Sequence, residues 1–349
     1  MTRGRRVLVA VALAVALLVL QQTASIAGTS RFSDALQNAL HVPWFAALTA
    51  LAIAISRPLH QRPRLRWTLL LLALPALAWF TEFVQQFTGR SFEWSDFGRD
   101  CLAAAGTVAV YRALISSSPR QSNPSSRSKL LWLALAAALF SWALANLLLV
   151  SAAYLQRDLA LPLLLNPDSA LSRVFLWPPP LEQQPDAAPG TPSGEPGIQL
   201  YSRSAGWDPL SLREPSTRLG DYAFMCTEID LRSRAGALLL LRVHDFTHER
   251  SVRRYEDRFN LEQRIAPGHQ TIAIPISSLR NAPRGRSMNM ADIAEILVLI
   301  LSPPEPQAQL RVLRIYVGAD CASGPASQSF DGGRADSGRA NAPERPTSR

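Results

Sequence analysis

Cysteine and histidine are scarce in this chain, which has three cysteines and five histidines among 349 residues. No two cysteines form a C-x-x-C pair, and none is spaced from a histidine as zinc ligands are. The sequence therefore predicts no metal site and no cofactor. It also lacks a recognisable nucleophile motif, which favours a non-enzymatic protein.

The net charge of +9 is not gathered into a basic patch. The arginines are scattered, and several of them flank apolar runs. That placement is typical of residues that orient membrane helices, whereas a nucleic-acid surface gathers its basic residues on one face. We therefore expect membrane lipid, and no nucleic acid, as a partner.

The N-terminal half contains apolar runs long enough to cross a bilayer. They predict an all-α bundle of five transmembrane helices over residues 1–155, at about 7–27, 40–55, 67–87, 97–115 and 130–155. A cleaved signal peptide ending near Ala27 is an alternative interpretation of the first run.

The basic residues predict how these helices are oriented. They cluster in Arg3–Arg6, Arg57–Arg66 and Arg120–Lys129, which alternate with the predicted spans. Basic loops remain in the cytoplasm, so the turn Glu82–Asp100 and everything after Leu155 should lie outside. We expect a multi-pass protein of the bacterial inner membrane with an extracytoplasmic C-terminal half.

The C-terminal half is divided by composition. Residues 156–197 begin as an apolar segment broken by Pro162 and Pro167, predicted to lie along the outer interface, and continue as a Pro-rich spacer. Residues 198–320 change to a strand-like period and predict an all-β sandwich of jelly-roll type. Residues 321–349 are rich in Gly, Ser, Pro and Arg and should be disordered. The candidate strands are Ile198–Ser202, Tyr222–Leu231, Ala237–His244, Thr271–Ile276, Ile293–Leu301 and Leu310–Val317.

Short pieces of this half resemble the galactose-binding-like jelly rolls that serve as carbohydrate-binding modules. The pieces are WDPL at 207–210, LRVHD at 241–245, DRFN at 257–260 and PGHQTI at 267–272. The resemblance implies a glycan-binding face, for which Trp207, Tyr222, Phe246 and Tyr255 are the aromatic candidates, although aromatics in strands also fill cores. His244, Asp245 and His248 have no further ligand in view, so we interpret them as a turn and a strand cap.

The turn between the third and fourth predicted spans is dense in polar groups. Ionisable residues at membrane depth are functional candidates by default. Two interpretations stay open: a polar site at the outer leaflet, or a network of ion pairs and hydrogen bonds that joins two helices. The candidate cluster comprises Asp34, Glu82, Gln85, Gln86, Arg90, Asp96, Arg99 and Asp100.

The pattern E-x-x-Q-x-F-x-G-R-S-F-x-x-x-D, from 82 to 96, resembles the VanZ-like family of small bacterial membrane proteins. The resemblance covers about 32–111 and rests on Glu82, Gln85 or Gln86, Gly89, Arg90 and Asp96. Asn38 stands where the family often has His, and Asp100 stands where it often has Asn. The family is named after a glycopeptide (teicoplanin) resistance determinant, so the resemblance implies a cell-envelope context.

These observations favour a protein that binds an envelope glycan, glycolipid or glycopeptide through its outer face and sandwich. One alternative is an envelope enzyme that acts on a lipid-linked substrate, with Glu82, Asp96 and Asp100 as acid/base groups. Another is a membrane scaffold whose sandwich binds a periplasmic protein.

Cys226 and Cys321 are the two cysteines placed outside the membrane. Cys226 lies in an early candidate strand and Cys321 just beyond the last one. Early and final strands of such sandwiches are often neighbours, and an oxidising periplasm would join the two thiols in a disulfide. The alternative is that Cys226 is a buried free thiol and Cys321 belongs to the mobile tail.

Overall fold

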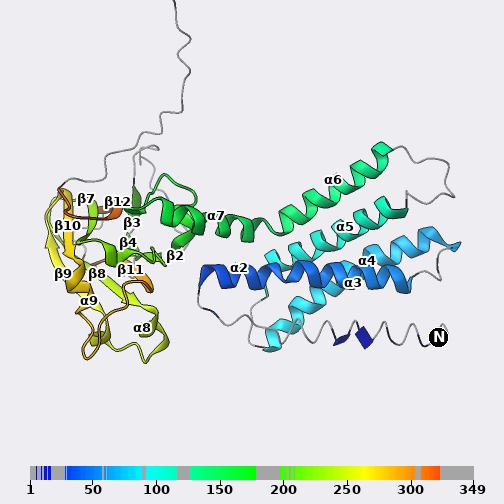
Figure 1. Cartoon of the computed structure of the whole chain (residues 1–349), viewed down its shortest axis with the longest axis horizontal. Coiled ribbons are helices and arrows are strands. Elements are labelled where there is room, and N and C mark those ends of the chain that lie inside the picture. Colours follow the sequence, from blue (N-terminus) through cyan, green and yellow to red (C-terminus); the bar gives the residue numbers. More distant parts are fainter. Residues whose placement is uncertain are drawn as a thin grey trace, which may run out of the picture.

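The computed structural model describes residues 5, 9, 12–13, 15–16, 28, 30–56, 59, 61–88, 92–115, 126–177, 197–200, 202–203, 206–207, 209–302 and 308–322. It has helices in the N-terminal half and antiparallel sheets in the C-terminal half, which confirms that division of the sequence (Figure 1). The predicted first span, spacer and tail fall largely outside these residues. The helices are α2 (Arg31–Ala39), α3 (His41–Ile55), α4 (Pro63–Gln85), α5 (Trp94–Ile115), α6 (Ser126–Ala143) and α7 (Ala145–Leu159).

The number of spans differs from the prediction of five. Among the described residues, two helical segments are long and apolar enough to cross a membrane, Arg31–Ile55 and Pro63–Gln85. The pair α6 and α7 is a third if it counts as one span. Helix α5 is long enough but carries Asp96 in its first turn and Arg112 in its last, and these charges reduce its apolar character.

The fifth predicted span is broken at Leu144, where α6 and α7 meet at an angle of 62°. The apolar run 130–155 predicted one tilted helix, and it has no proline or glycine near the break. The bend has a tertiary cause: α6 packs on α5, whereas α7 leaves the bundle and packs on α2 (Figure 1).

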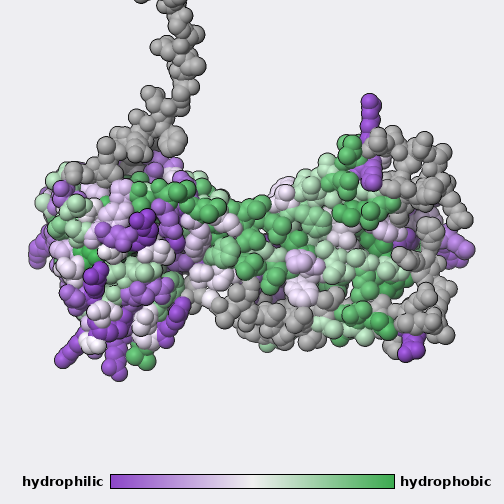
Figure 2. Space-filling model, viewed as in Figure 1, coloured by the Kyte–Doolittle hydropathy of each residue, from purple (hydrophilic) through white to green (hydrophobic). Residues whose placement is uncertain are grey.

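Helix α4 has the residue pattern of a helix in lipid. Leu71, Leu72 and Phe80 are exposed, whereas Arg66, Glu82 and Gln85 are buried. This pattern is compatible with a membrane span, in which polar groups face the protein interior because lipid offers them no hydrogen-bond partners. Figure 2 shows the same contrast over the molecule, with hydrophobic residues covering the bundle and hydrophilic ones covering most of the sandwich.

The C-terminal half contains two five-stranded antiparallel sheets. One has the order β1-β12-β7-β10, with β3 also paired to β12, and the other has the order β2-β6-β11-β8-β9. Strands β4 and β5 form a separate pair. The strands are β1 (Leu163–Leu165), β2 (Leu176–Trp177), β3 (Ile198–Leu200), β4 (Ser202–Arg203), β5 (Gly206–Trp207), β6 (Leu210–Arg213), β7 (Phe224–Arg232), β8 (Ala237–Asp245), β9 (Phe259–Ile265), β10 (Gly268–Pro275), β11 (Ile293–Ser302) and β12 (Gln309–Gly318).

Alternating apolar residues of the facing strands form one core. Leu239, Leu241 and Val243 on β8 are buried against Ile296 and Val298 on β11 and against residues of the opposite sheet. This alternation allowed all six candidate strands to be recognised from the sequence. Strands β6 and β9 were not predicted: β6 has only four residues, and β9 (Phe259–Ile265) begins within the DRFN piece at 257–260.

The segment 157–176 differs from the prediction that it lies along the membrane interface. Its β1 pairs with β12 and its β2 pairs with β6, so it adds an edge strand to each sheet. Leu165 and Leu176 are fully buried in the sandwich core. Their apolar character therefore reflects packing against protein.

Glu214 connects the bundle to the sandwich. It follows β6 in the left-handed region, at φ 49°, and accepts a 2.8 Å hydrogen bond from the backbone N–H of Arg31 at the start of α2. Its other oxygen accepts from the Tyr154 hydroxyl on α7. The Arg31 guanidinium also donates to the Leu176 carbonyl oxygen at 3.1 Å. These contacts fix α2 and α7 against the sandwich.

Candidate functional site

A buried polar cluster lies where the N-terminal end of α3 meets the C-terminal end of α4 and the N-terminal end of α5. At its centre is His41, whose Nδ1 is 3.1 Å from Asp100 Oδ1. His41 Nε2 lies 3.6 Å from Asp96 Oδ2, and Nδ1 lies 4.0 Å from Glu82 Oε1. The exposed fractions of these four residues are 0–3 %, so the cluster is closed to solvent.

Neighbouring groups orient the carboxylates of this cluster. Gln85 Nε2 donates to Glu82 Oε1 at 3.2 Å, and the backbone N–H of Glu93 donates to Glu82 Oε2 at 3.4 Å. Arg99 pairs with Asp96 Oδ1 at 2.5 Å and donates to the Asn38 carbonyl oxygen at 3.3 Å. The cluster therefore joins three helices through both charge and hydrogen bonds.

The structure gathers five of the eight residues predicted for the polar cluster: Glu82, Gln85, Asp96, Arg99 and Asp100. Gln86 is exposed, Asp34 faces a separate pocket, and Arg90 lies outside the described residues.

His41, the central residue of the cluster, was not among the residues predicted from the sequence. A signal was present, because Asp34, Asn38 and His41 recur at i, i+4 and i+7 along α2 and α3 and share one face of a nearly continuous helix.

A second site is a cavity of about 510 Å³ between α2, α7 and the segment that leads into β2. This volume is within the range of about 300–1,000 Å³ that is usual for small-molecule sites. Polar and apolar residues both line it, and α7 contributes Asn146, Leu149 and Val150. The cavity is lined by Arg31, Asp34, Ala35, Gln37, Asn38, Glu93, Asn146, Leu149, Val150, Arg173, Val174 and Leu176.

The aromatic candidates on the sandwich have different surroundings. Phe246 is 6 % exposed and Tyr222 packs against the core, whereas Tyr255 is 57 % exposed. Trp207 lies in β5, and its side chain is outside the described set. Of the three described rings, only Tyr255 is open enough to stack on a sugar.

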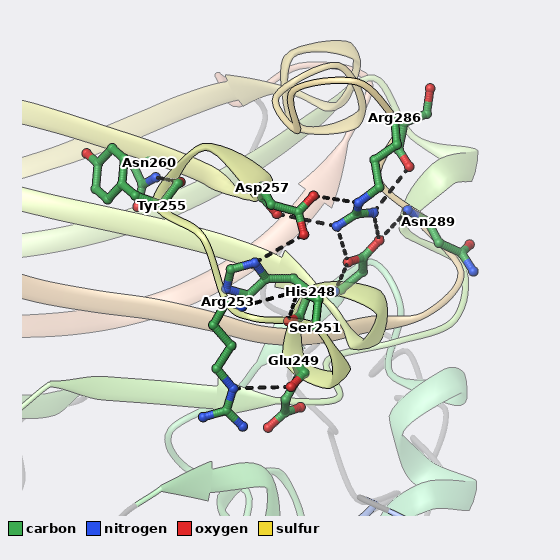
Figure 3. Close-up of polar contacts among 11 residues, drawn as sticks. His248, Glu249, Ser251, Arg253, Tyr255, Asp257, Asn260, Arg286 and Asn289 are labelled. Carbon is green, nitrogen blue, oxygen red and sulfur yellow. Dashed lines mark hydrogen bonds and ion pairs between the residues drawn. The ribbon is translucent and has the colours of Figure 1, made fainter.

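His244, Asp245 and His248 belong to a network of ion pairs and caps. Asp245 accepts from the backbone N–H of His248 at 3.0 Å and so caps α8 (Phe246–Arg250). Figure 3 shows Arg286 directed at Asp257, with His248 approaching the same carboxylate. The Arg286 Nε–Asp257 Oδ1 distance is 2.6 Å, and the His248 Nδ1–Asp257 Oδ2 distance is 3.4 Å.

The two buried histidines of this network make the sandwich sensitive to acid. Burial and, to a smaller extent, the nearby His248 lower the pKa of His244 to about 4. The unfolded chain takes up this proton near pH 6.5 and the folded chain only near pH 4, so stability falls as the pH drops through that interval. The expected loss is on the order of 3 kcal/mol.

Hydrogen exchange of β8 and β11 between pH 7 and pH 4 measures this loss after correction for intrinsic rates. A His244→Gln variant should show a weaker pH dependence. His269 has a side chain that is 58 % exposed, so His269→Gln is the matched control and should behave as the wild type. Equal pH dependence in all three proteins would contradict the assignment to His244.

Cys226 on β7 and Cys321 just after β12 are joined by a disulfide, with their Cα atoms 5.7 Å apart. The two strands are neighbours in one sheet, and Tyr316 lies opposite Cys226. Cys101 in α5 is a free, half-buried thiol.

Comparisons with known proteins found little similarity. No family model matches the chain, and no curated protein matches it. Among solved structures, one similar chain is the family 11 carbohydrate-binding module of the cellulosomal cellulase Lic26A-Cel5E of Clostridium thermocellum. The similarity covers 35 % of this chain and 75 % of that module, with 16 % identity and a TM-score of 0.25.

Proposed function

We propose that this protein is a membrane-anchored binding protein of the bacterial cell envelope, which binds the sugar headgroup of a glycolipid or lipid-linked glycan. The observation that carries the proposal is the 510 Å³ cavity at the junction of bundle and sandwich. It is bounded by helices of the bundle and by a segment of the sandwich. If the bundle spans the membrane, this junction is where a lipid would present its headgroup.

The side chains of the cavity suit such an amphipathic ligand. Asp34 and Glu93 offer acceptors, and Arg31 and Asn146 offer donors, which together match the hydroxyl groups of a sugar. Leu149 is 46 % exposed beside the cavity and offers an apolar path for a lipid chain.

The distribution of charge and cysteine supports an extracytoplasmic position for the cavity. Arg62 and Arg64 at the start of α4, and Arg127 and Lys129 at the start of α6, lie at the end of the bundle opposite the sandwich (Figure 1). Basic residues mark the cytoplasmic side. The disulfide of the sandwich is typical of an oxidising compartment.

The motif from Glu82 to Asp96 supports a VanZ-like assignment of the bundle, and it contributes Glu82, Gln85 and Asp96 to the buried cluster. The alternative of an acid/base enzyme has less support, because Glu82 and Asp100 are 0 % exposed and Asp96 is 2 % exposed. The alternative of a scaffold that binds a periplasmic protein also has less support, because the cavity has the volume of a small-molecule site.

Titration of the full chain in a non-glycosidic detergent with an alkyl disaccharide tests the proposal. We expect binding by the wild type, at least about tenfold weaker binding by Asp34→Ala, and about 2–12-fold weaker binding by Asn146→Ala. Each variant removes one hydrogen-bonding group, and a hydrogen bond contributes about 0.5–1.5 kcal/mol, or 1.5–3 kcal/mol for a charged group.

Two controls identify the ligand group and the binding surface. An alkyl phosphocholine of the same chain length should bind more weakly, because it lacks the sugar hydroxyls. Tyr255→Ala should bind as the wild type does. If only Tyr255→Ala weakens binding, the sugar binds to the sandwich surface; if the wild type does not bind the disaccharide, the proposal is wrong.

A further inference from the structure

The two ring nitrogens of His41 have different partners. Nδ1 is within hydrogen-bond distance of Asp100 Oδ1, at 3.1 Å. Nε2 is 3.6 Å from Asp96 Oδ2, too far for a good hydrogen bond. Histidines that bind metals show this arrangement, with one nitrogen held by a carboxylate and the other directed at the ion.

The 3.6 Å separation fits two ligands of one ion. Zinc lies about 2.0–2.2 Å from imidazole nitrogen and carboxylate oxygen, so two ligands at the tetrahedral angle are about 3.4 Å apart. One ligand atom each from His41, Glu82 and Asp96 lie within 4.8 Å of one another. Glu82 Oε1 lies 4.0 Å from Nδ1, the nitrogen that Asp100 contacts, so the Glu82 carboxylate would have to turn toward Nε2 to reach the same ion.

The cluster also offers carboxylates that could serve as ligands. The carboxylates of Glu82, Asp96 and Asp100 lie together, and these residues are 0–2 % exposed. Among the described contacts, His41 pairs with Asp100 and Arg99 pairs with Asp96. Asp100 Oδ2 is buried and accepts no hydrogen bond from the described residues. Buried carboxylates are costly unless they are paired or coordinate a metal.

We propose that His41, Glu82 and Asp96 bind a divalent transition-metal cation of the Zn²⁺ or Mn²⁺ class, with Asp100 as a positioning residue for His41. One imidazole and two carboxylates suit these ions, whereas Mg²⁺ prefers oxygen ligands and retains its waters. Arg99 occupies Oδ1 of Asp96, so Oδ2 is the oxygen directed at the ion.

The site would tie the bundle together next to the cavity. Its ligands come from α3, α4 and α5, so one ion would fix three helices. Glu93 connects the two regions, since its backbone N–H contacts Glu82 and its residue lines the cavity. The proposal does not depend on the cavity binding a glycan.

The test uses the full chain in detergent after treatment with a chelator and removal of the chelator. Zn²⁺ and Mn²⁺ are titrated separately, with Mg²⁺ as the comparison ion, and the bound metal is measured by elemental analysis and calorimetry. We expect about one Zn²⁺ or Mn²⁺ per chain, a higher melting temperature with that ion, and no equivalent effect of Mg²⁺.

Three near-isosteric variants test the assigned roles. Glu82→Gln combined with Asp96→Asn should abolish both binding and the shift in melting temperature. Asp100→Asn should weaken binding about 10–100-fold, the usual effect of losing the partner of a metal-bound histidine. Asp34→Asn should bind metal as the wild type does, because Asp34 lines the cavity.

Two results would overturn the proposal. One is the absence of Zn²⁺ and Mn²⁺ binding by a folded wild-type protein. The other is equal binding by the wild type and the Glu82→Gln, Asp96→Asn double variant. If the double variant does not fold, unchanged affinity of folded Asp100→Asn would also contradict the proposed arrangement.

Discussion

Replacement of Cys321 by serine is expected to lower the free energy of unfolding of the sandwich by about 4–5 kcal/mol. The Cys226–Cys321 bond closes a loop with a sequence separation of 95 residues, and the unfolded chain gains entropy when it is opened. Hydrogen exchange of β7 and β12 measures the loss. We expect roughly 10³-fold faster exchange in the strand centres, since each 1.4 kcal/mol is a factor of ten.

Cys101→Ser is the control, because Cys101 is a free thiol in α5, away from the sandwich. It should leave exchange of β7 and β12 unchanged. Adding a reductant to the wild type should reproduce the effect of Cys321→Ser and should not change that variant further. Wild-type exchange rates in Cys321→Ser would show that the bond does not stabilise these strands.

Arg286→Ala is expected to destabilise the sandwich by about 3–5 kcal/mol. Arg286 contacts both oxygens of Asp245, at 2.6 and 2.9 Å, and Asp245 is 0 % exposed. Burial alone would raise the pKa of Asp245, but hydrogen bonds from Arg286 and from the backbone N–H groups of Asn289 and His248 hold that pKa below its usual range. The variant leaves a buried charge without its partner.

Thermal unfolding with hydrogen exchange of β8 measures the effect. Arg218→Ala is the matched control: it removes an exposed pair with Asp221, which contributes about 0–1 kcal/mol. Asp245→Asn retains a residue that can cap α8, so adding it to Arg286→Ala should recover part of the loss. A loss no larger than that of Arg218→Ala would show that the Asp245–Arg286 pair is not a major support.

Much of the secondary structure could be predicted from the sequence because it depends on neighbouring residues. The alternation of apolar residues identified β8, β11 and β12, and the long apolar runs identified α4 and α5. The same patterns predicted that Glu82 and Asp96 would lie in one polar region. A pattern of apolar residues does not, however, distinguish a surface covered by lipid from one covered by protein.

That ambiguity explains the errors in the segments between the two halves. Leu165 and Leu176 were placed at the membrane interface, yet they fill the sandwich core as parts of β1 and β2. The break at Leu144 likewise has no local signal. Its geometry follows from the packing of α6 on α5 and of α7 on α2, which are separated along the chain.

The helical and strand-forming halves and the acidic residues of the cluster could be predicted from the amino-acid sequence, because local periodicity and residue chemistry depend on neighbouring residues. The tertiary structure decided that His41 stands among Glu82, Asp96 and Asp100, and that Asp34 faces a cavity completed by α7. These residues lie far apart in sequence. Their proximity depends on how whole helices pack, which local patterns do not specify.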